Sequence, residues 1–526
     1  MARSNNNDNM PLLQQEPTAK DLLREAYEMQ AELQEFGDHL DRVYDGYFND
    51  FPKNIHRRLS SELAAALKDL QCRVESGQST AGSNFIFTQG VWEVAKRSKN
   101  IVMLTQSVNA GRFEHRRQYF APGERLKGLH QQPSAASWSQ KRRPDTRVVD
   151  VICDGGSTWT KVSSVSNSRL LFDMANEAVY VSDNEDEEKV SKNGMSADYS
   201  DVPIAKQVRF LKKVAEGHRF KGKSPSLNVF LPRIFEHEHP QIHQVVEVCR
   251  RMGTNVFCGD ALPPAEPLTQ ELLSIMVPGP RASLTPVLNI DTSVLIALVS
   301  DYCHFTLPDP KGLPRAIADH IALEREEQFL PRICSVLGDR DLTCTRQAAD
   351  TFTEIVHHIG RDTENARAHL LFAIDDNKTS EQRVEELHAL SDQPSDFLST
   401  LRLPIRVFNM TEEDCQAVLS PELTKVLNVL EQPTRSVFAS GWARNTTTVT
   451  TNMGAVKEFE KSLELATTED STFEWPSIWA FPNSRPLRTV PRGSNEPRIL
   501  KHIGDCRVAC TCGLERKLKQ DAQDDN

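Results

Sequence analysis

The chain contains no apolar run that approaches the about 20 residues a membrane-spanning helix requires. Its first 15 residues are rich in asparagine and contain no apolar segment of the kind found in secretion signals. The 11 cysteines lack the regular spacing of a disulfide framework, and the cluster Cys506, Cys510 and Cys512 has too few neighbouring ligands for a zinc site. We therefore expect no membrane partner and a reduced compartment, cytoplasmic or nuclear.

A general excess of positive charge is also absent, because acidic residues outnumber basic ones and the net charge is −11. This balance argues against a protein whose whole surface is positively charged for binding nucleic acid. It is compatible with local basic surfaces. Apolar residues make up only 39% of the 526 residues, so the sequence predicts two or three domains with long polar insertions.

The segment Leu288–Ser300, LNIDTSVLIALVS, organises the rest of the chain. Its first residues form a short apolar run that predicts a buried parallel strand. Asp291 ends that run, and Thr292 and Ser293 can cap a helix that continues to Val299. The carboxylate is therefore expected at the carboxyl-terminal edge of a sheet, where open α/β folds bind ligands.

This arrangement resembles the first motif of PIN domains (PilT N-terminus nucleases). Four segments are more specific and resemble an uncharacterised eukaryotic family known as domain of unknown function 1308, whose C-terminal half is considered PIN-like: 149–162, 287–305, 324–343 and 392–395. Glu364 and Arg367 also match this family. The resemblance implies an α/β protein with a C-terminal three-layer α/β/α PIN-like domain on a parallel sheet, preceded by a helical and α/β N-terminal region.

The expected order of parts follows from composition and periodicity. We predict a disordered start (1–18), a helical N-terminal region (19–120), an α/β domain (145–260) with an acidic disordered insertion (182–201), a proline-rich linker (261–285), the PIN-like domain (286–490) and a tail (491–526). Within these parts the patterns also predict a helix near 91–106 and short strands at 342–344, 436–438 and 478–481.

Active PIN nucleases hold Mg²⁺ or Mn²⁺ between several acids, and the resemblance implies that Asp291 is the first of them. Asp350 and Glu354 lie one turn apart on an amphipathic helix and are the candidates for the second acid, although a solvated helix face explains them equally well. A Gly-Asp pair supplies the third acid in better PIN-like relatives. Trp442 stands at that Asp position here, which leaves the metal site one carboxylate short.

A second candidate surface precedes the strand predicted at 227–231. The basic residues there are Lys206, Arg209, Lys212, Lys213, Arg219, Lys221 and Lys223, with Phe210 and Phe220 among them. Basic and aromatic residues together are typical of a nucleic-acid surface. An amphipathic helix with a charged outer face is the alternative interpretation. The strand–helix–strand order that follows predicts a parallel βαβ unit.

The runs 147–153 and 158–165 predict two strands joined by the turn Asp154–Ser157. Asp150 or Asp154 followed by Lys161 is similar to the acid–lysine pattern of restriction-endonuclease-like folds. Trp159 stands where that pattern requires an acid, so a structural hairpin is the favoured interpretation.

These observations favour a degenerate, non-catalytic PIN-like module that binds RNA or a protein partner. The alternative is a metal-dependent ribonuclease of PIN type with Asp291 as the central metal ligand. The two hypotheses differ in whether other carboxylates converge on Asp291.

Overall fold

A computed structural model describes residues 18–44, 54–77, 83–109, 146–182, 199–259, 266–307, 309, 311, 313–373 and 377–488. The predicted disordered start and the C-terminal tail lie outside these residues, as does the acidic insertion except for Ser182 and Tyr199–Asp201. The chain divides into two compact units, which meet in sequence at Pro280 and Arg281.

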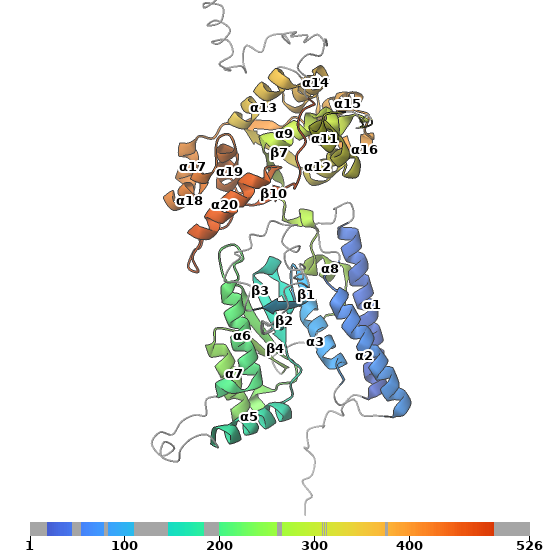
Figure 1. Cartoon of the computed structure of the whole chain (residues 1–526), viewed down its shortest axis with the longest axis vertical. Coiled ribbons are helices and arrows are strands. Elements are labelled where there is room, and N and C mark those ends of the chain that lie inside the picture. Colours follow the sequence, from blue (N-terminus) through green and yellow to red (C-terminus); the bar gives the residue numbers. More distant parts are fainter. Residues whose placement is uncertain are drawn as a thin grey trace, which may run out of the picture. The chain divides into compact units, whose positions relative to one another are not determined.

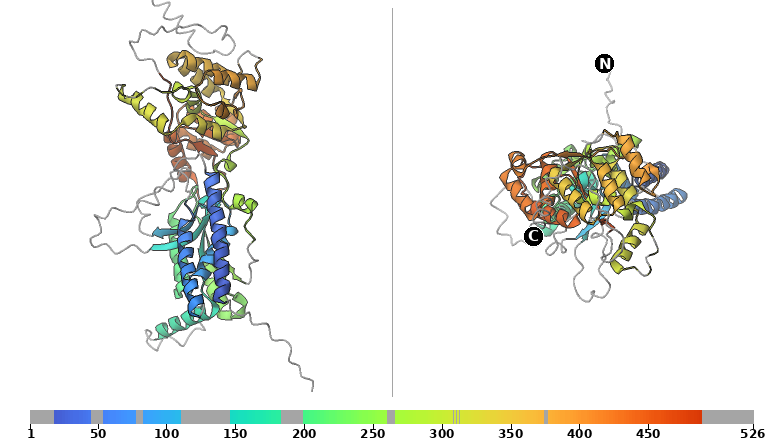
Figure 2. Two further views of the ribbon diagram at one scale, coloured as in Figure 1. Left: turned by 90° about the vertical axis from the view of Figure 1, so that its right-hand side faces the viewer. Right: turned by 90° about the horizontal axis from the view of Figure 1, so that it is seen from above.

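The first unit contains a mixed sheet and, among its described residues, seven α-helices and several 3₁₀ turns. Figures 1 and 2 show their arrangement. The strands are β1 (Met103–Asn109), β2 (Thr146–Cys153), β3 (Thr158–Val162), β4 (Ser226–Leu231) and β5 (Asn255–Cys258). The α-helices are α1 (Ala19–Val43), α2 (Arg57–Ser76), α3 (Phe85–Lys96), α5 (Asn167–Ser182), α6 (Pro203–Gly217), α7 (Pro240–Arg251) and α8 (Gln270–Met276). The 3₁₀ helices include η3 (Asp154–Gly156), η4 (Tyr199–Asp201) and η5 (Glu236–Glu238).

The sheet of the first unit has the order β1-β2-β3-β4-β5. Strand β2 is antiparallel to both of its neighbours, β1 and β3, whereas β3, β4 and β5 are mutually parallel. The predicted hairpin and the predicted βαβ unit, β4–α7–β5, are therefore confirmed. Helix α3 packs against β2 and β3, and α6 packs against β2 and β4.

The predicted helix near 91–106 and the predicted linker at 261–285 both differ in the structure. The helix predicted near 91–106 is wrong in its second half, since α3 ends at Lys96 and residues from Met103 form β1. The sequence Ile101–Leu104 is apolar enough to continue a helix, but its pairing with β2 decides for a strand. The proline-rich segment before the second unit includes α8, whose Leu273 and Met276 are buried.

The second unit is built on a five-stranded sheet in the order β10-β9-β6-β7-β8, in which all neighbours are parallel. Its strands are β6 (Val287–Ile290), β7 (Asp341–Thr345), β8 (Arg406–Phe408), β9 (Thr447–Thr450) and β10 (Ile478–Ala480). Strand β6 lies at the centre, and Asp291 directly follows it. The prediction of an acid at the carboxyl end of a central parallel strand is confirmed.

Helices connect every pair of strands in the second unit. They are α9 (Thr292–Val299), α10 (Asp301–His304), α11 (Arg315–Glu326), α12 (Phe329–Leu337), α13 (Arg346–Ile359), α14 (Asp362–Leu371), α15 (Ser380–Ala389), α16 (Ser395–Leu398), α17 (Glu412–Val418), α18 (Pro421–Val426), α19 (Thr434–Ala443) and α20 (Met453–Ala466). Connections between parallel strands are almost always right-handed, so the strand order puts α9–α16 on one face of the sheet and α17–α20 on the other. Figure 1 shows the two groups around the strands. This is the expected three-layer α/β/α arrangement.

The strand predicted at 436–438 is wrong, because these residues belong to α19. Val437 and Phe438 are buried there against Val456 and Phe459 of α20. A three-residue apolar run fits either a strand or one face of a helix, and packing between α19 and α20 decides for the helix.

The expectation of no membrane-spanning segment agrees with the structure. None of the helices in the described part of the chain combines the length and the apolar character needed to cross a bilayer.

Candidate functional site

The Asp291 site is formed where β6 and β9 end side by side. The amide of Asp291 donates to the carbonyl oxygen of Val449 (3.0 Å), which extends the β6–β9 pairing by one residue. Asp291 is the N-cap of α9, and Thr450 is the last residue of β9. The hydroxyls of Ser293 and Thr450 both donate to Asp291 Oδ2, at 2.6 Å each.

Burial dominates the electrostatics of Asp291. Only 2% of the residue is exposed, and this desolvation raises the pKa of its carboxyl above the usual value, against the lowering effect of the hydrogen bonds from Ser293 and Thr450. The residues that follow the neighbouring strands, Thr451 and Asn452 after β9 and Arg346 after β7, carry no carboxylate. The side chains that contact the carboxylate are therefore the hydroxyls of Ser293 and Thr450.

The two acids predicted to accompany Asp291 lie on α13, which begins directly after β7. Asp350 is exposed, and its nearest ionic partner is Arg346 of the same helix, at 4.0 Å. Glu354 is exposed one turn further along. Within the described residues, the only set of three or more acid, histidine or cysteine ligands lies elsewhere, in the first unit. The Asp291 site thus lacks the converging oxygen ligands that Mg²⁺ or Mn²⁺ requires, and we derive no metal-dependent step from it.

The interpretation of Trp442 as the replacement for a third acid is wrong. Trp442 lies in the last turn of α19, a few residues before β9 begins, and therefore at the amino-terminal edge of the parallel sheet. Its indole donates to the carbonyl oxygen of Glu474 (2.9 Å) and its ring packs against Phe459 and Phe473. Asp291 lies at the opposite edge of the sheet. Its partner there, Thr450, was not among the predicted site residues. Threonine is β-branched, so the threonine-rich run after Asn445 was a signal for β9.

The basic residues predicted as a nucleic-acid surface lie on α6 and the hairpin after it. Ile204, Val208, Leu211 and Val214 bury one face of α6. Lys206, Arg209 and Lys213 follow at helical spacing on the exposed face. Lys212 is half-buried, and its ammonium donates to the carbonyl oxygen of Gly253 at 3.5 Å.

The hairpin continues this basic surface beyond the helix. Phe220 and Lys223 exchange backbone hydrogen bonds of 2.8 and 3.2 Å around Lys221-Gly222, where both residues have positive φ. Arg219 and Lys221 are exposed, and Lys223 is half-buried. We call α6 and the hairpin, residues 203–223, the basic surface.

A buried acid–lysine pair lies in the sheet of the same unit. The Lys161 ammonium is 2.9 Å from Asp150 Oδ2, and Asp150 is fully buried. Desolvation raises the pKa of Asp150, and the charge of Lys161 opposes this rise. Trp159, two residues before Lys161, packs against His218 at 4.6 Å between ring centroids. The Asp150–Lys161 pair contains a single carboxylate. It therefore supports the interpretation of β2 and β3 as a structural hairpin and not as a metal-dependent site.

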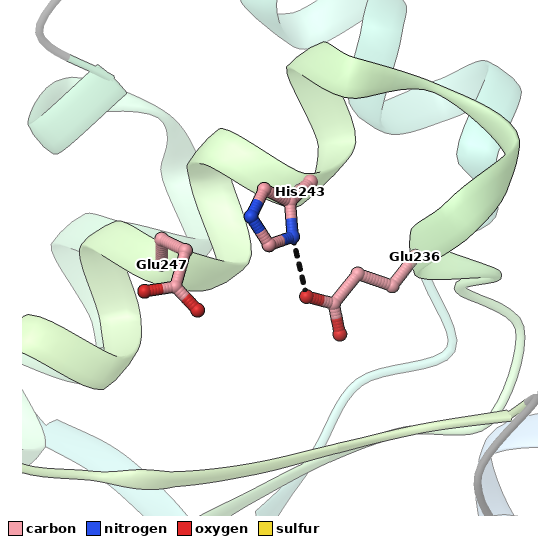
Figure 3. Close-up of side chains that lie close together, drawn as sticks. All are labelled: Glu236, His243 and Glu247. Carbon is pink, nitrogen blue, oxygen red and sulfur yellow. Dashed lines mark hydrogen bonds and ion pairs between the residues drawn. The ribbon is translucent and has the colours of Figure 1, made fainter.

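The only cluster of potential metal ligands among the described residues is Glu236, His243 and Glu247, shown in Figure 3. His243 Nδ1 lies 2.7 Å from Glu236 Oε1. The guanidinium of Arg250 donates to both oxygens of Glu236 (2.6 and 2.8 Å) and to Glu247 (2.7 Å), and these bonds lower the pKa of Glu236. Arg250 already pairs with both carboxylates, so the cluster links η5 to α7 through its own hydrogen bonds.

Comparison with known proteins finds one family. Residues 288–395 match the model of the family described as Protein of unknown function (DUF1308). The chain resembles DUF1308 proteins. No solved structure matches the chain. The DUF1308 segment contains Asp291 together with Asp350 and Glu354, but the family description assigns no activity to them.

The residues that carried this resemblance form a buried network within the DUF1308 segment. Arg367, which is fully buried, donates to the carbonyl oxygens of Val299 (2.8 Å) and Leu390 (2.6 and 3.0 Å) and to Asp301 Oδ1 (2.8 Å). Glu364 accepts from the amide of Asp301 at 2.9 Å. This network joins α10, α14 and the end of α15.

His304 and Asp392 extend the same network. His304 Nε2 lies 2.7 Å from the carbonyl oxygen of Leu298, and burial lowers the pKa of its imidazole to about 3. The Asp392 amide donates to the carbonyl oxygen of His304, and its carboxylate accepts from the amide of Thr306. Arg367, Glu364 and His304 are buried, whereas Asp392 is exposed at the edge of the network. The contacts of these residues hold the helices of the DUF1308 segment together.

Proposed function

We propose that this chain is an RNA-binding protein in which the C-terminal unit is a degenerate, non-catalytic PIN-like module. Contact with RNA is assigned to the basic surface of the first unit, residues 203–223. The proposal has two parts, the absence of catalysis and the binding of RNA, and each rests on a separate observation.

The absence of catalysis rests on the surroundings of Asp291. Its carboxylate is buried, accepts hydrogen bonds from Ser293 and Thr450, and has a raised pKa, which favours the neutral acid. A hydrolytic metal site needs ionised carboxylates that converge on the cation. The exposed Asp350 and Glu354 on α13 do not form such a set with Asp291. These features support a module that has kept the fold without the ligands.

RNA binding rests on the segregation of charge. The whole chain carries a net charge of −11, yet residues 203–223 contain seven Lys or Arg residues and a single acid, Glu216. A local concentration of positive charge in an acidic protein attracts polyanions. A protein partner with an acidic surface is the competing ligand, and an ordinary solvated helix face is the structural alternative. The experiments below separate these cases.

We expect the purified wild-type protein to show no Mn²⁺-dependent cleavage of single-stranded RNA. Asp291→Asn should leave this result unchanged. At pH 7 the free energy of unfolding of the variant should be equal to that of the wild type or higher by up to about 1 kcal/mol. The amide removes the cost of either burying this carboxylate or keeping it protonated. Robust cleavage by the wild type that is lost in Asp291→Asn would instead establish the ribonuclease alternative.

The pH dependence of this variant provides a second measurement. The folded-state pKa of Asp291 is raised above the usual value of 3.8, so the folded protein binds this proton more tightly than the unfolded chain. The contribution of Asp291 to stability is therefore greatest at low pH and decreases as pH rises from about 3.8 to the folded-state pKa. In urea denaturation, the free energy of unfolding of Asp291→Asn should increase relative to that of the wild type as pH rises. A constant difference across this range would contradict the buried-carboxylate assignment.

Reversing three charges on the basic surface should weaken RNA binding. For Lys206→Glu/Arg209→Glu/Lys213→Glu, we expect at least about a tenfold loss of affinity and a salt dependence reduced by about three ion equivalents. Fluorescence anisotropy with labelled RNA at several salt concentrations measures both quantities. The matched control is Lys20→Glu/Arg57→Glu/Lys68→Glu, which changes the net charge equally on exposed positions of α1 and α2. Equal losses in both triple variants would indicate a non-specific charge effect and remove the assignment of the surface.

A further inference from the structure

We infer that the basic surface binds the phosphate backbone of a duplex in preference to a single strand, without reading bases. The inference rests on the proposed function and specifies the class of nucleic acid that the same surface takes. Three properties of the surface carry it: the environment of its aromatic rings, its rigidity and the arrangement of its charges.

The aromatic rings in the basic surface are engaged by the protein itself. The guanidinium of Arg147 lies 5.3 Å from the centroid of the Phe210 ring. The ring of Phe220 packs on the η3 turn so closely that a Cβ added to Gly156 would lie 3.2 Å from its edge. The Lys221 ammonium lies 5.9 Å from the centroid of the same ring. Proteins that bind single strands without sequence preference stack bases on open aromatic faces. These two half-buried rings do not offer such a platform.

The positive charges are held on a rigid frame. Helix α6 is fixed by its buried face against the sheet, and the hairpin is closed by reciprocal backbone hydrogen bonds between Phe220 and Lys223. Lys206, Arg209 and Lys213 form a row of about 10 Å, from the rise of about 1.5 Å per helical residue. Arg209 is held in place by Asp201 (3.6 Å) and by the carbonyl oxygen of Ser200. A preformed row fits the stiff ladder of phosphates in a duplex, whereas a flexible strand must be ordered to match it.

The charge density of the nucleic acid also favours binding of a duplex. A surface without stacking groups gains its affinity from neutralised phosphates and released counterions. Double-stranded nucleic acid has the higher linear charge density, so each lysine or arginine contact releases more counterion there than on a single strand. Duplex RNA is also recognised mainly through its shape and backbone.

The test uses the full-length protein and four labelled probes in fluorescence anisotropy. The probes are two 20-base-pair RNA duplexes of different sequence, one unstructured single RNA strand and one DNA duplex. We expect both RNA duplexes to bind within about twofold of each other and at least about tenfold tighter than the single strand. The Lys206→Glu/Arg209→Glu/Lys213→Glu variant should lose this binding, and Phe220→Leu should keep it within about twofold, since the ring does not stack on bases.

The outcomes separate this inference from the proposed function. Tighter binding of the single strand, lost in the triple variant, overturns the duplex preference and leaves RNA binding intact. A loss of at least fivefold in Phe220→Leu for the single strand indicates base stacking and also overturns the inference. Binding of the DNA duplex alone supports backbone recognition of a duplex but overturns the assignment to RNA. Absence of binding to all four probes overturns both proposals and leaves the protein-partner alternative.

Discussion

Arg367→Met is expected to lower the free energy of unfolding of the second unit by about 3–5 kcal/mol, the cost of breaking a buried ion pair from one side. The substitution removes the partner of Asp301, which is 2% exposed, and leaves the carbonyl oxygens of Val299 and Leu390 without the guanidinium. Methionine retains much of the side-chain volume, so the loss reports the polar network and not a large cavity. Urea denaturation followed by circular dichroism measures it.

Two further variants make this prediction specific. Arg346→Met removes an arginine whose side chain is 52% exposed and whose nearest acid, Asp350, is 4.0 Å away, so it should change stability by less than about 0.5 kcal/mol. The double variant Arg367→Met/Asp301→Asn should recover part of the loss, because it no longer buries an unpaired carboxylate. A loss below about 1 kcal/mol in Arg367→Met would mean that the network does not hold the DUF1308 segment together.

Lys161→Met should destabilise the first unit by a similar amount, about 3–5 kcal/mol at pH 7. The pair is fully enclosed, since Lys161 and Asp150 have exposed side-chain fractions of 8% and 0%. Without the ammonium, Asp150 retains only the hydrogen bond from the amide of Val162 (2.6 Å) to offset its desolvation. Its pKa, already raised by burial, should then rise further.

The pH dependence checks the cause of this loss. Because the folded variant would hold Asp150 as a neutral acid, its deficit relative to the wild type should shrink as pH falls from 7 toward the unfolded value of 3.8. The double variant Asp150→Asn/Lys161→Met should recover most of the stability at pH 7, since the amide oxygen still accepts from Val162. An equal deficit at pH 7 and pH 4.5 would show that the loss comes from packing and not from charge.

Local sequence patterns were sufficient to predict the secondary structure of segments whose conformation depends mainly on their own residues. The run Val287–Ile290 followed by Asp291 predicts a strand, an acid and a helix, and β6 and α9 have this order. The predicted cap by Thr292 and Ser293 is wrong, because both residues lie inside α9 and Asp291 is its N-cap. The turn Asp154–Gly156 between two β-rich runs likewise predicts the β2–β3 hairpin. In these segments, propensity, capping and periodicity all favour the same local structure.

Patterns were insufficient where neighbours decide the structure. Residues 436–438 suit a strand as well as a helix, and only their packing against α20 selects α19. Strand β9 has no apolar alternation, because three of its four residues are threonine. The β-branched threonines are its only local signal, and pairing with β6 and β10 establishes it as a strand. The prediction that Trp442 lies beside Asp291 depended on the strand predicted at 436–438. These residues form α19 instead, and Trp442 lies at the other edge of the sheet.

The sequence by itself determined the class of the fold, the position of Asp291 at the end of a central parallel strand, the concentration of basic residues in 203–223 and the resemblance to DUF1308. Only the tertiary structure decided what these residues meet: Asp291 faces hydroxyls and not other acids, Phe210 and Phe220 are engaged by their own unit, and Arg367 closes a buried network. Strand and helix patterns depend on neighbours along the chain, whereas the partners of a carboxylate or a ring also come from segments far away in the sequence, as Thr450 does for Asp291 and Arg147 does for Phe210.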